Sequence, residues 1–316
     1  MVGNELSEEV NIKRGVRQGC VLSPLLFNLY SEDIIQEALE DQHTTGVKVN
    51  GKIINNIRYA DDTVLLAETL DDLQGLLDQV VKTSEKRGLT LNTKKTKFMT
   101  ITKHQQQPET LWIKGEPVER VCKYKYLGTT VTDNNEYSEE IRSRIGQART
   151  TFNKMRNVLC RTDLSLHLKI RMLKCYVFPV LLYGMEAWTL KKNDTDRLEA
   201  FEMWAYRRIL RISWTSRTTN KEVLRRMGKD KEIMTIIKIR KLQYLGHVMR
   251  GERYTLLQNI LQGKILGKRS IGRRRISWLN NLRQWFNSSS IDLFRAVTSK
   301  IKIAMLIANL LKGDGT

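Results

Sequence analysis

Two adjacent carboxylates, Asp61 and Asp62, are the residues of this 316-residue chain with the clearest potential for chemistry. They lie between two apolar runs, residues 53–58 and 63–67, whose composition predicts the strands of a β-hairpin. Like charges this close repel each other, and a divalent cation removes that cost. Mg²⁺ takes hard oxygen ligands and commonly uses one or two protein carboxylates with substrate phosphates. The hairpin is therefore a candidate metal platform for phosphoryl or nucleotidyl transfer, although Asp-Asp pairs also occur in ordinary turns.

A loop that runs into a helix precedes this hairpin. Ser23 is expected to cap the helix and Pro24 to occupy its first position, where a missing N–H is not needed. Residues 14–19 hold two glycines and two arginines; glycine lets backbone approach a ligand, and arginine binds phosphate with a bidentate fork. An ordinary capped helix behind a basic loop is the alternative. Apolar residues at helical spacing predict an amphipathic helix of about four turns: Leu25, Leu26, Leu29, Ile34, Ile35, Ala38 and Leu39.

Together these two elements resemble motifs B and C of reverse transcriptases. Residues 17–24 (Arg-Gln-Gly-Cys-Val-Leu-Ser-Pro) favour the non-LTR, LINE-type retrotransposon branch, and residues 59–62 (Tyr-Ala-Asp-Asp) resemble motif C. Residues 88–99 resemble motif D, and residues 124–129 resemble the primer-grip hairpin, motif E. The four motifs occur in the family's order, so the chain is identified as similar to this branch over residues 13–130.

The resemblance implies two-metal nucleotidyl transfer, in which Mg²⁺ ions stabilise the attacking 3′-oxygen and the leaving pyrophosphate oxygen. Asp61 is expected to be the principal metal ligand and Asp62 a weaker one, because adjacent strand residues point to opposite faces. Lys95 is expected near the triphosphate, where it would donate a proton or charge; a solvated side chain is the alternative. The residues expected to contact nucleotide, primer or template are Arg17, Gln18, Gly19, Tyr59, Ala60, Tyr126, Leu127 and Gly128.

The family's third metal-binding carboxylate, which belongs to motif A, has no counterpart ahead of motif B, where only Glu5, Glu8 and Glu9 occur. Stabilisation of transition-state charge is usually the largest catalytic contribution. We therefore expect an N-terminally truncated chain, without fingers and motif A, that does not polymerise on its own. The alternatives are a catalytically dead nucleic-acid-binding remnant and a translated relic without a stable fold.

The expected fold is α+β. A partial reverse-transcriptase palm of β-hairpins and packed helices is expected over residues 1–132, and an all-helical thumb over 133–190. A basic helical C-terminal region over 191–296 and an unassigned tail over 297–316 would follow. The predicted helices of the second half begin at Tyr137 or Ser138, span Leu166–Leu182 with Pro179 kinking or ending the helix, span Thr195–Ile212 with Asn193 or Asp194 as cap, and span Lys221–Met227 and Lys231–Met249.

The net charge of +20 is concentrated near the C-terminus, where residues 201–316 contain 25 Lys and Arg against 7 Asp and Glu. Such a surface binds polynucleotides in a salt-dependent way, with anionic membranes or acidic proteins as alternatives. The most basic run also reads as a nuclear localisation signal. Trp278 and Trp285 follow it on a predicted helix, as core residues rather than base-stacking platforms. The residues of the run expected to bind nucleic acid are Lys264, Lys268, Arg269, Arg273, Arg274 and Arg275.

The partners implied by the resemblance are an RNA template, a DNA primer and, in the intact enzyme, dNTP. The four cysteines show neither disulfide nor zinc spacing, which favours reduced thiols in an intracellular protein of the nucleus and cytoplasm. The longest apolar run, Ile301–Leu311, includes Lys302 and Asn309 and is too short to span a bilayer, so no membrane partner is expected.

Overall fold

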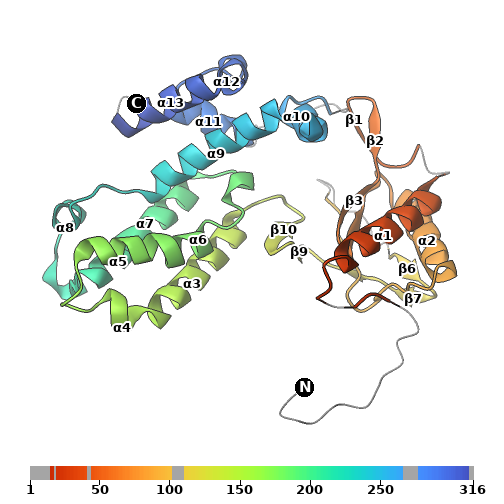
Figure 1. The fold of residues 1–316 in the computed structure, drawn as a ribbon, viewed down its shortest axis with the longest axis horizontal. Helices are drawn as coiled ribbons and strands as arrows, with labels where there is room; N and C mark the ends of the chain where they lie inside the picture. Colours follow the sequence, from red (N-terminus) through yellow and green to blue (C-terminus); the bar gives the residue numbers. More distant parts are fainter. Residues whose placement is uncertain (1–14, 18, 41–43, 102–109, 266–276, 313–316) are drawn as a thin grey trace, which may run out of the picture. The chain divides into compact units, whose positions relative to one another are not determined.

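The computed structural model describes residues 15–17, 19–40, 44–101, 110–265 and 277–312 (Figure 1). It combines α-helices with short strands, which confirms the expected α+β class. Internal contacts divide the chain into two compact units. The first, here called the N-terminal unit, comprises Met1–Phe98 and Gln105–Arg120; the second, the helical unit, comprises Met99–His104 and Val121–Thr316. Within the described ranges, no helix is long and apolar enough to cross a membrane.

Two helices and several two-stranded sheets form the N-terminal unit. Helix α1 (Ser23–Leu39) packs against α2 (Leu70–Lys86), which Thr69 caps by accepting a hydrogen bond from the backbone N–H of Asp72 at 3.1 Å. The antiparallel pairs are β1 (Val47–Val49) with β2 (Lys52–Ile54), β3 (Asn56–Tyr59) with β4 (Asp62–Leu65), and β6 (Trp112–Ile113) with β7 (Glu116–Pro117). Strand β5 (Lys97–Phe98) pairs in parallel with β8 (Glu119–Arg120).

The apolar run over residues 53–58 is split between two hairpins. Residues 52–54 pair with β1, and residues 56–59 pair with β4. The predicted hairpin around Asp61 and Asp62 is therefore confirmed, but its first strand is shorter than the apolar run. Asn55, between the two strands, still extends the ladder, because its carbonyl accepts the N–H of Leu66 at 2.7 Å.

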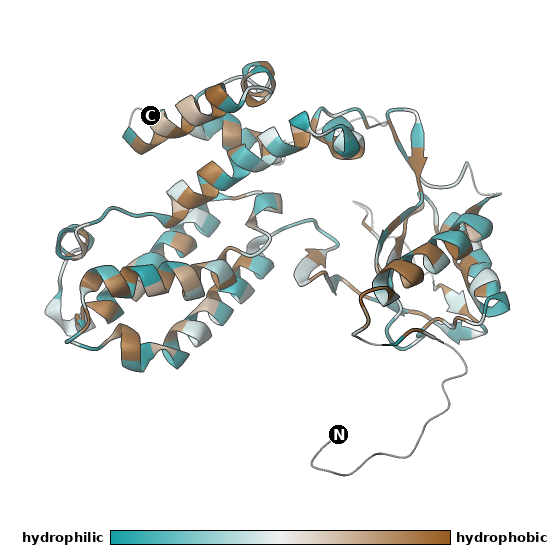
Figure 2. Ribbon diagram, in the orientation of Figure 1, coloured by the Kyte–Doolittle hydropathy of each residue, from teal (hydrophilic) through white to brown (hydrophobic). Residues whose placement is uncertain are grey.

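Helix α1 differs from expectation at its beginning. Leu22 occupies the cap position, and Ser23 is already the first helical residue, with its hydroxyl donating to the carbonyl of Arg17 at 2.6 Å. Only the second half of the predicted apolar stripe is buried, at residues 34–39. Figure 2 shows that the first half is hydrophobic as well, yet its three leucines, at positions 25, 26 and 29, are more than half exposed.

The helical unit begins with a hairpin, β9 (Lys123–Tyr126) and β10 (Thr129–Thr132), and continues almost entirely as helices. The helices are α3 (Ser138–Lys154), α4 (Arg156–Leu159), α5 (Leu166–Met172), α6 (Phe178–Leu181), α7 (Lys192–Ile209), α8 (Asn220–Met227), α9 (Ile233–Arg250), α10 (Thr255–Leu261), α11 (Trp278–Trp285), α12 (Ser290–Val297) and α13 (Lys300–Lys312). A π-helical segment (Leu173–Val177) joins α5 to α6.

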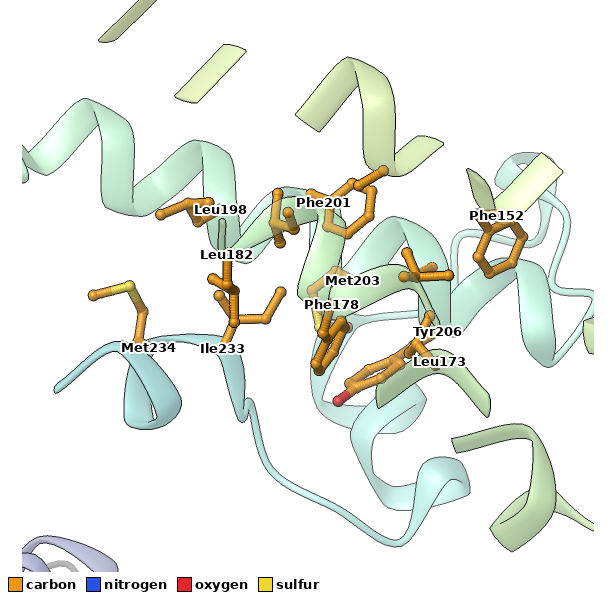
Figure 3. Close-up of a cluster of buried hydrophobic side chains, with 14 of the residues drawn as sticks. Phe152, Leu173, Phe178, Leu182, Leu198, Phe201, Met203, Tyr206, Ile233 and Met234 are labelled. Atoms are coloured by element: carbon orange, nitrogen blue, oxygen red, sulfur yellow. The ribbon is translucent and has the colours of Figure 1, made fainter. Parts of the chain in front are cut away.

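A large hydrophobic core joins α3, α7, α9 and the helices between them (Figure 3). Its labelled aromatic side chains, Phe152, Phe178, Phe201 and Tyr206, come from three helices and have 3% exposed surface or less. Glu202 is buried in the same region and accepts hydrogen bonds from the Tyr206 hydroxyl at 2.8 Å and from two backbone N–H groups at the start of α9. Burial raises the pKa of Glu202.

One predicted helix is interrupted, and another has wrong bounds. The predicted helix Leu166–Leu182 has the expected ends, but a π-helical segment interrupts it: an i→i+5 pattern replaces the α pattern over Leu173–Val177, just before the turn that contains Pro179. Helix α7 begins at Lys192 and not at Thr195, because Asp194 acts from inside the first turn: its carboxylate accepts the backbone N–H of Lys191 at 3.3 Å. The other predicted helices agree with α3, α8 and α9 to within two residues.

A buried lysine connects α9 with α11. The ammonium of Lys241 has no exposed surface and donates to the carbonyl of Trp188 at 2.6 Å and to Oδ1 of Asn281 at 3.4 Å. It also lies 4.7 Å from the ring centroid of Trp278 and 5.3 Å from that of Trp285. Both tryptophans are half-buried and pack against hydrophobic core residues, as expected. Burial lowers the pKa of Lys241 to about 7.

Candidate functional site

The Asp61 and Asp62 carboxylates lie at the tip of the β3–β4 hairpin. Tyr59 pairs with Asp62, so Ala60 and Asp61 form the turn, and Ala60 adopts a left-handed backbone conformation with φ of 53°. Both aspartates are exposed, and neither joins an ion pair within the part of the chain that the structure describes. The turn thus presents two adjacent carboxylates to solvent.

The base of this hairpin is held against the two helices. Arg58 of β3 forms an ion pair with Glu32 of α1 at 2.8 Å, and its hydrogen bond lowers the pKa of Glu32. Leu65 of β4 and Ala67 pack against the cluster between α1 and α2, whose members include Ile35, Leu76 and Val80. A fixed base and an exposed tip are what a metal-binding turn requires, because the ligand oxygens keep their position while a substrate reaches them.

The donor set fits a hard divalent cation in type. Carboxylate oxygens are preferred Mg²⁺ ligands, and one or two of them suffice when water and phosphate complete the octahedron. Asp61 and Asp62 supply two carboxylates. Across the described ranges, no group of three or more His, Cys, Asp or Glu side chains is arranged to hold a metal ion.

The motif D segment forms a tight turn on the N-terminal unit. Asn92 organises it: its side-chain oxygen accepts the N–H of Lys95 at 3.1 Å, and its carbonyl accepts the N–H of Thr96 at 2.9 Å. The Lys95 side chain is exposed, and no ion pair of the described chain includes it. Lys97, two residues later, is instead paired with Glu119. Lys95 therefore remains available to an anionic ligand.

The motif B loop is described only in part. The carbonyl of Arg17 accepts the N–H of Cys20 at 3.2 Å in addition to the Ser23 hydroxyl, which closes a turn in front of α1. Gly19 has φ of 87°, a conformation that favours glycine, and the Arg17 side chain is exposed. Gln18 lies outside the described residues.

The β9–β10 hairpin has a two-residue turn formed by Leu127 and Gly128. Their φ angles of 47° and 80° are the pair required by a type I′ turn, and the left-handed conformation is unusual for leucine. Leu127 is 41% exposed, so an apolar side chain projects from the tip of the hairpin. Tyr126, the last residue before the turn, is half-buried.

Side chains from elsewhere in the helical unit hold this turn. The Tyr183 hydroxyl donates to the carbonyl of Leu127 at 3.0 Å, and the Arg144 guanidinium donates to the carbonyl of Gly128. Arg144 also lies 4.5 Å from the centroid of the Tyr183 ring. We call Glu140, Arg144, Tyr183 and Gly184 the hairpin clamp.

Glu140 completes the clamp. Its carboxylate accepts the N–H of Thr130 at 2.9 Å and pairs with Arg144 at 2.6 Å. Burial opposes ionisation, but the hydrogen bonds from Thr130 and Arg144 outweigh it and lower the pKa of Glu140. The clamp was not predicted from the sequence. Two glycines were the available sign of it in the sequence, and the structure explains both. A Cβ on Gly128 would lie 3.3 Å from the Tyr183 ring, and one on Gly184 would lie 2.9 Å from the Thr129 hydroxyl.

The structure brings Asp61 and Asp62 together in one turn, with Tyr59 and Ala60 beside them, and it places Arg17, Gly19 and Lys95 in the same N-terminal unit. Tyr126, Leu127 and Gly128 belong to the helical unit. Of the basic run, Lys264 is described and exposed, whereas Lys268, Arg269, Arg273, Arg274 and Arg275 lie outside the described residues. The four cysteines are free, as expected.

Comparison with known proteins agrees with the motif assignment. Residues 1–131 match the reverse transcriptase (RNA-dependent DNA polymerase) family. A transposon-derived protein of Caenorhabditis elegans is 31% identical over 258 residues, which cover 78% of this chain and 90% of that protein. The RNA-directed DNA polymerase from mobile element jockey of Drosophila funebris is 27% identical over 67% of this chain, but this chain spans only 23% of the jockey protein.

A third relative extends the similarity to a further retrotransposon. The retrovirus-related Pol polyprotein from the type-1 retrotransposable element R2 of Popillia japonica is 27% identical over 198 residues, 59% of this chain and 31% of its own length. The similarity to jockey and R2 reaches beyond residue 131, because each alignment covers more of the chain than the family match does. The chain belongs to the reverse transcriptases of non-LTR, LINE-type retrotransposons.

Proposed function

We propose that the N-terminal unit is part of a reverse-transcriptase palm in which Asp61 and Asp62 bind Mg²⁺ for nucleotidyl transfer. The exposed carboxylate pair on an anchored hairpin is the observation that carries this proposal. The proposed domains are the partial palm over residues 1–132, the thumb over 133–190 and the basic C-terminal region over 191–296. The β9–β10 hairpin would be the primer grip, attached to the thumb helix α3 through the hairpin clamp.

Each residue of the turn has a distinct part in this proposal. When bound, Mg²⁺ supplies charge stabilisation at the attacking 3′-oxygen and at the leaving pyrophosphate oxygen. Asp61 holds the metal from the turn itself, and Asp62 holds it more weakly from the first position of β4. Lys95 offers its exposed ammonium to the triphosphate, and Tyr59 and Ala60 lie near the primer end and support the turn.

We further propose that this chain binds template and primer but does not extend a primer by itself. Two carboxylates are the full complement that the described residues bring to the turn. With a carboxylate fewer than the family's metal site uses, the negative oxygens of the transition state would be stabilised less. A second polypeptide that brings a further carboxylate would restore activity. A nucleic-acid-binding remnant is the second candidate, favoured by the positive charge of the helical unit.

Metal binding and primer extension test these proposals separately. Titration with Mn²⁺, followed by its electron paramagnetic resonance signal, should show one or two bound ions in the chain and a loss of binding in Asp61→Ala. Asp78→Ala is the matched control, because Asp78 is an exposed aspartate on α2 in the same unit. Equal Mn²⁺ binding by both variants and the unaltered chain would refute the metal site.

Primer extension on an RNA template should yield no product with the unaltered chain. The same template–primer, fluorescently labelled, should bind with an affinity that falls steeply as salt rises. Extension that disappears in Asp61→Ala would refute the proposed inactivity and would mean that the metal site is complete. Absence of both extension and salt-dependent binding would refute the proposed template–primer partners.

A further inference from the structure

An indole ring on α7 is fixed at the surface of the helical unit. Trp204 is half-buried, and its ring packs against two buried phenylalanines: the centroids of Phe152 and Phe201 lie 4.9 and 5.7 Å away. Because both phenylalanines have no exposed surface, the part of the indole that contacts them is anchored in the core. The remaining surface of the ring is therefore a rigid platform rather than a mobile side chain.

Two exposed arginines are placed on this platform from different helices. The guanidinium carbon of Arg149, on α3, lies 5.4 Å from the Trp204 ring centroid, and that of Arg208, one turn further along α7, lies 5.8 Å from it. An aromatic face attracts a cation and orients the flat guanidinium, but it satisfies none of the five N–H donors. These donors remain available for an anion.

Among the described residues, neither arginine has a carboxylate partner, in contrast to the two neighbouring arginines of α8. Arg225 and Arg226 on α8 both pair with Glu222 at 2.7 Å. In contrast, no ion pair among the described residues includes Arg149 or Arg208. Two like charges around one ring repel each other, and within the described ranges no ion pair compensates for this repulsion. An external anion would.

The row of arginines continues along α3. Arg142 precedes Arg149 by seven residues, which is two helical turns, so both lie on the same exposed side of the helix. Seven residues span about 10 Å of helix, so the two guanidinium groups start from positions about 10 Å apart along α3. A sugar–phosphate backbone that lies along this side of α3 can therefore contact both arginines.

We propose that Arg149 and Arg208, oriented by Trp204, form a phosphate-binding site that takes the sugar–phosphate backbone of a nucleic-acid duplex, with Arg142 extending it along α3. Guanidinium and phosphate match in a bidentate geometry. The site rests on the proposed template–primer binding. It goes beyond that proposal because it assigns part of the contact to the α3–α7 surface rather than to the basic run after Lys264.

The double variant Arg149→Gln/Arg208→Gln of the full chain tests this site. Binding of a fluorescein-labelled RNA–DNA hybrid of 20 base pairs would be followed by anisotropy between 50 and 200 mM salt. The logarithm of affinity falls with the logarithm of salt concentration, and each phosphate contact contributes about 0.9 to the steepness of this line. Loss of two contacts should therefore make the line less steep by about 2. The matched control, Arg225→Gln/Arg226→Gln, removes the same charge from paired arginines and should keep the slope of the unaltered chain.

The outcomes separate this site from the proposed function. Salt-dependent binding by the unaltered chain, with an unchanged slope in Arg149→Gln/Arg208→Gln, would overturn the site alone. An equal fall of slope in both double variants would also overturn it, because total charge and not the Trp204 platform would then matter. No binding of the hybrid by the unaltered chain would overturn the proposed template–primer partners as well. If Arg149→Gln/Arg208→Gln lost binding to poly-glutamate but bound the hybrid as the unaltered chain does, the phosphate site would be overturned and the arginines would be assigned to an acidic protein partner.

Discussion

Replacing Lys241 with methionine should abolish a rise of stability with pH in the helical unit. The ammonium is fully buried, and its hydrogen-bond partners among the described residues are the carbonyl of Trp188 and the side chain of Asn281; two indole rings lie within 5.3 Å of it. Methionine has similar length and no charge, so Lys241→Met removes the titrating group and keeps most of the packing. The prediction concerns the free energy of unfolding as a function of pH.

The size of the effect follows from the two pKa values. Burial lowers the pKa of Lys241 from 10.5 to about 7 in the folded chain. Between these values the unfolded state binds more protons than the folded state, so stability rises with pH. Below pH 7 both states are protonated, and the full cost of burying the charge is present. At about 1.36 kcal/mol for each pKa unit, the rise from pH 7 to pH 9 amounts to about 2 kcal/mol.

Urea unfolding followed by tryptophan fluorescence is a suitable assay, because all tryptophans except Trp112 lie in the helical unit. The unaltered chain should gain about 2 kcal/mol between pH 7 and 9, and Lys241→Met should gain far less. Lys302→Met is the control: Lys302 is exposed on α13, so this variant should keep the full rise. A rise that persists in Lys241→Met would refute the assignment to Lys241.

Three further substitutions probe backbone conformation and packing. Leu127→Asn puts a residue that tolerates left-handed backbone before a glycine and should slow amide exchange in β9 and β10, with a gain of up to about 1 kcal/mol; faster exchange would contradict this. Glu202→Leu leaves the Tyr206 hydroxyl and two N–H groups without their acceptor and should cost about 3 kcal/mol or more by urea unfolding; a smaller loss would mean that water replaces the carboxylate. Gly246→Ala places a Cβ 2.3 Å from Ile303 and should cost about 1–3 kcal/mol and speed tryptic cleavage of α13, whereas an unchanged cleavage rate would show that Ile303 simply rotates away.

The sequence predicted those features that depend on local chemistry. The helix from Ser138, the helix from Asn220 and the hairpin around Asp61 follow from periodicity, caps and β-propensity within a few residues. Boundaries failed where a side chain had two plausible positions. Asp194 can act as the N-cap of a helix, or it can support the N-cap from the third helical position. The second arrangement holds here, because α7 begins directly after Lys191 and the Asp194 carboxylate accepts the N–H of Lys191.

Long-range features could not be read from the sequence. The hydrophobic first half of α1 has the pattern of a buried stripe, but pattern alone does not reveal which part of a stripe finds a partner. The hairpin clamp joins residues up to 56 positions apart, and its hydrogen bonds to the hairpin run to backbone groups, which are the same in every residue type. For the candidate site, the two adjacent carboxylates of Asp61 and Asp62 on a hairpin could be predicted from the sequence. The roles of these carboxylates and of Lys95 stay predictions.

The hairpin clamp has a consequence for how such sequences diverge. Gly128 leaves space for the ring of Tyr183, and Gly184 leaves space for the hydroxyl of Thr129, so each end of the contact contains a glycine fitted to a side chain at the other. A larger residue at one end is tolerated only when the opposite side chain shrinks. In related elements, these two short segments should therefore change in concert, and a chimera that takes the hairpin from one element and the Tyr183 segment from another should be poorly folded.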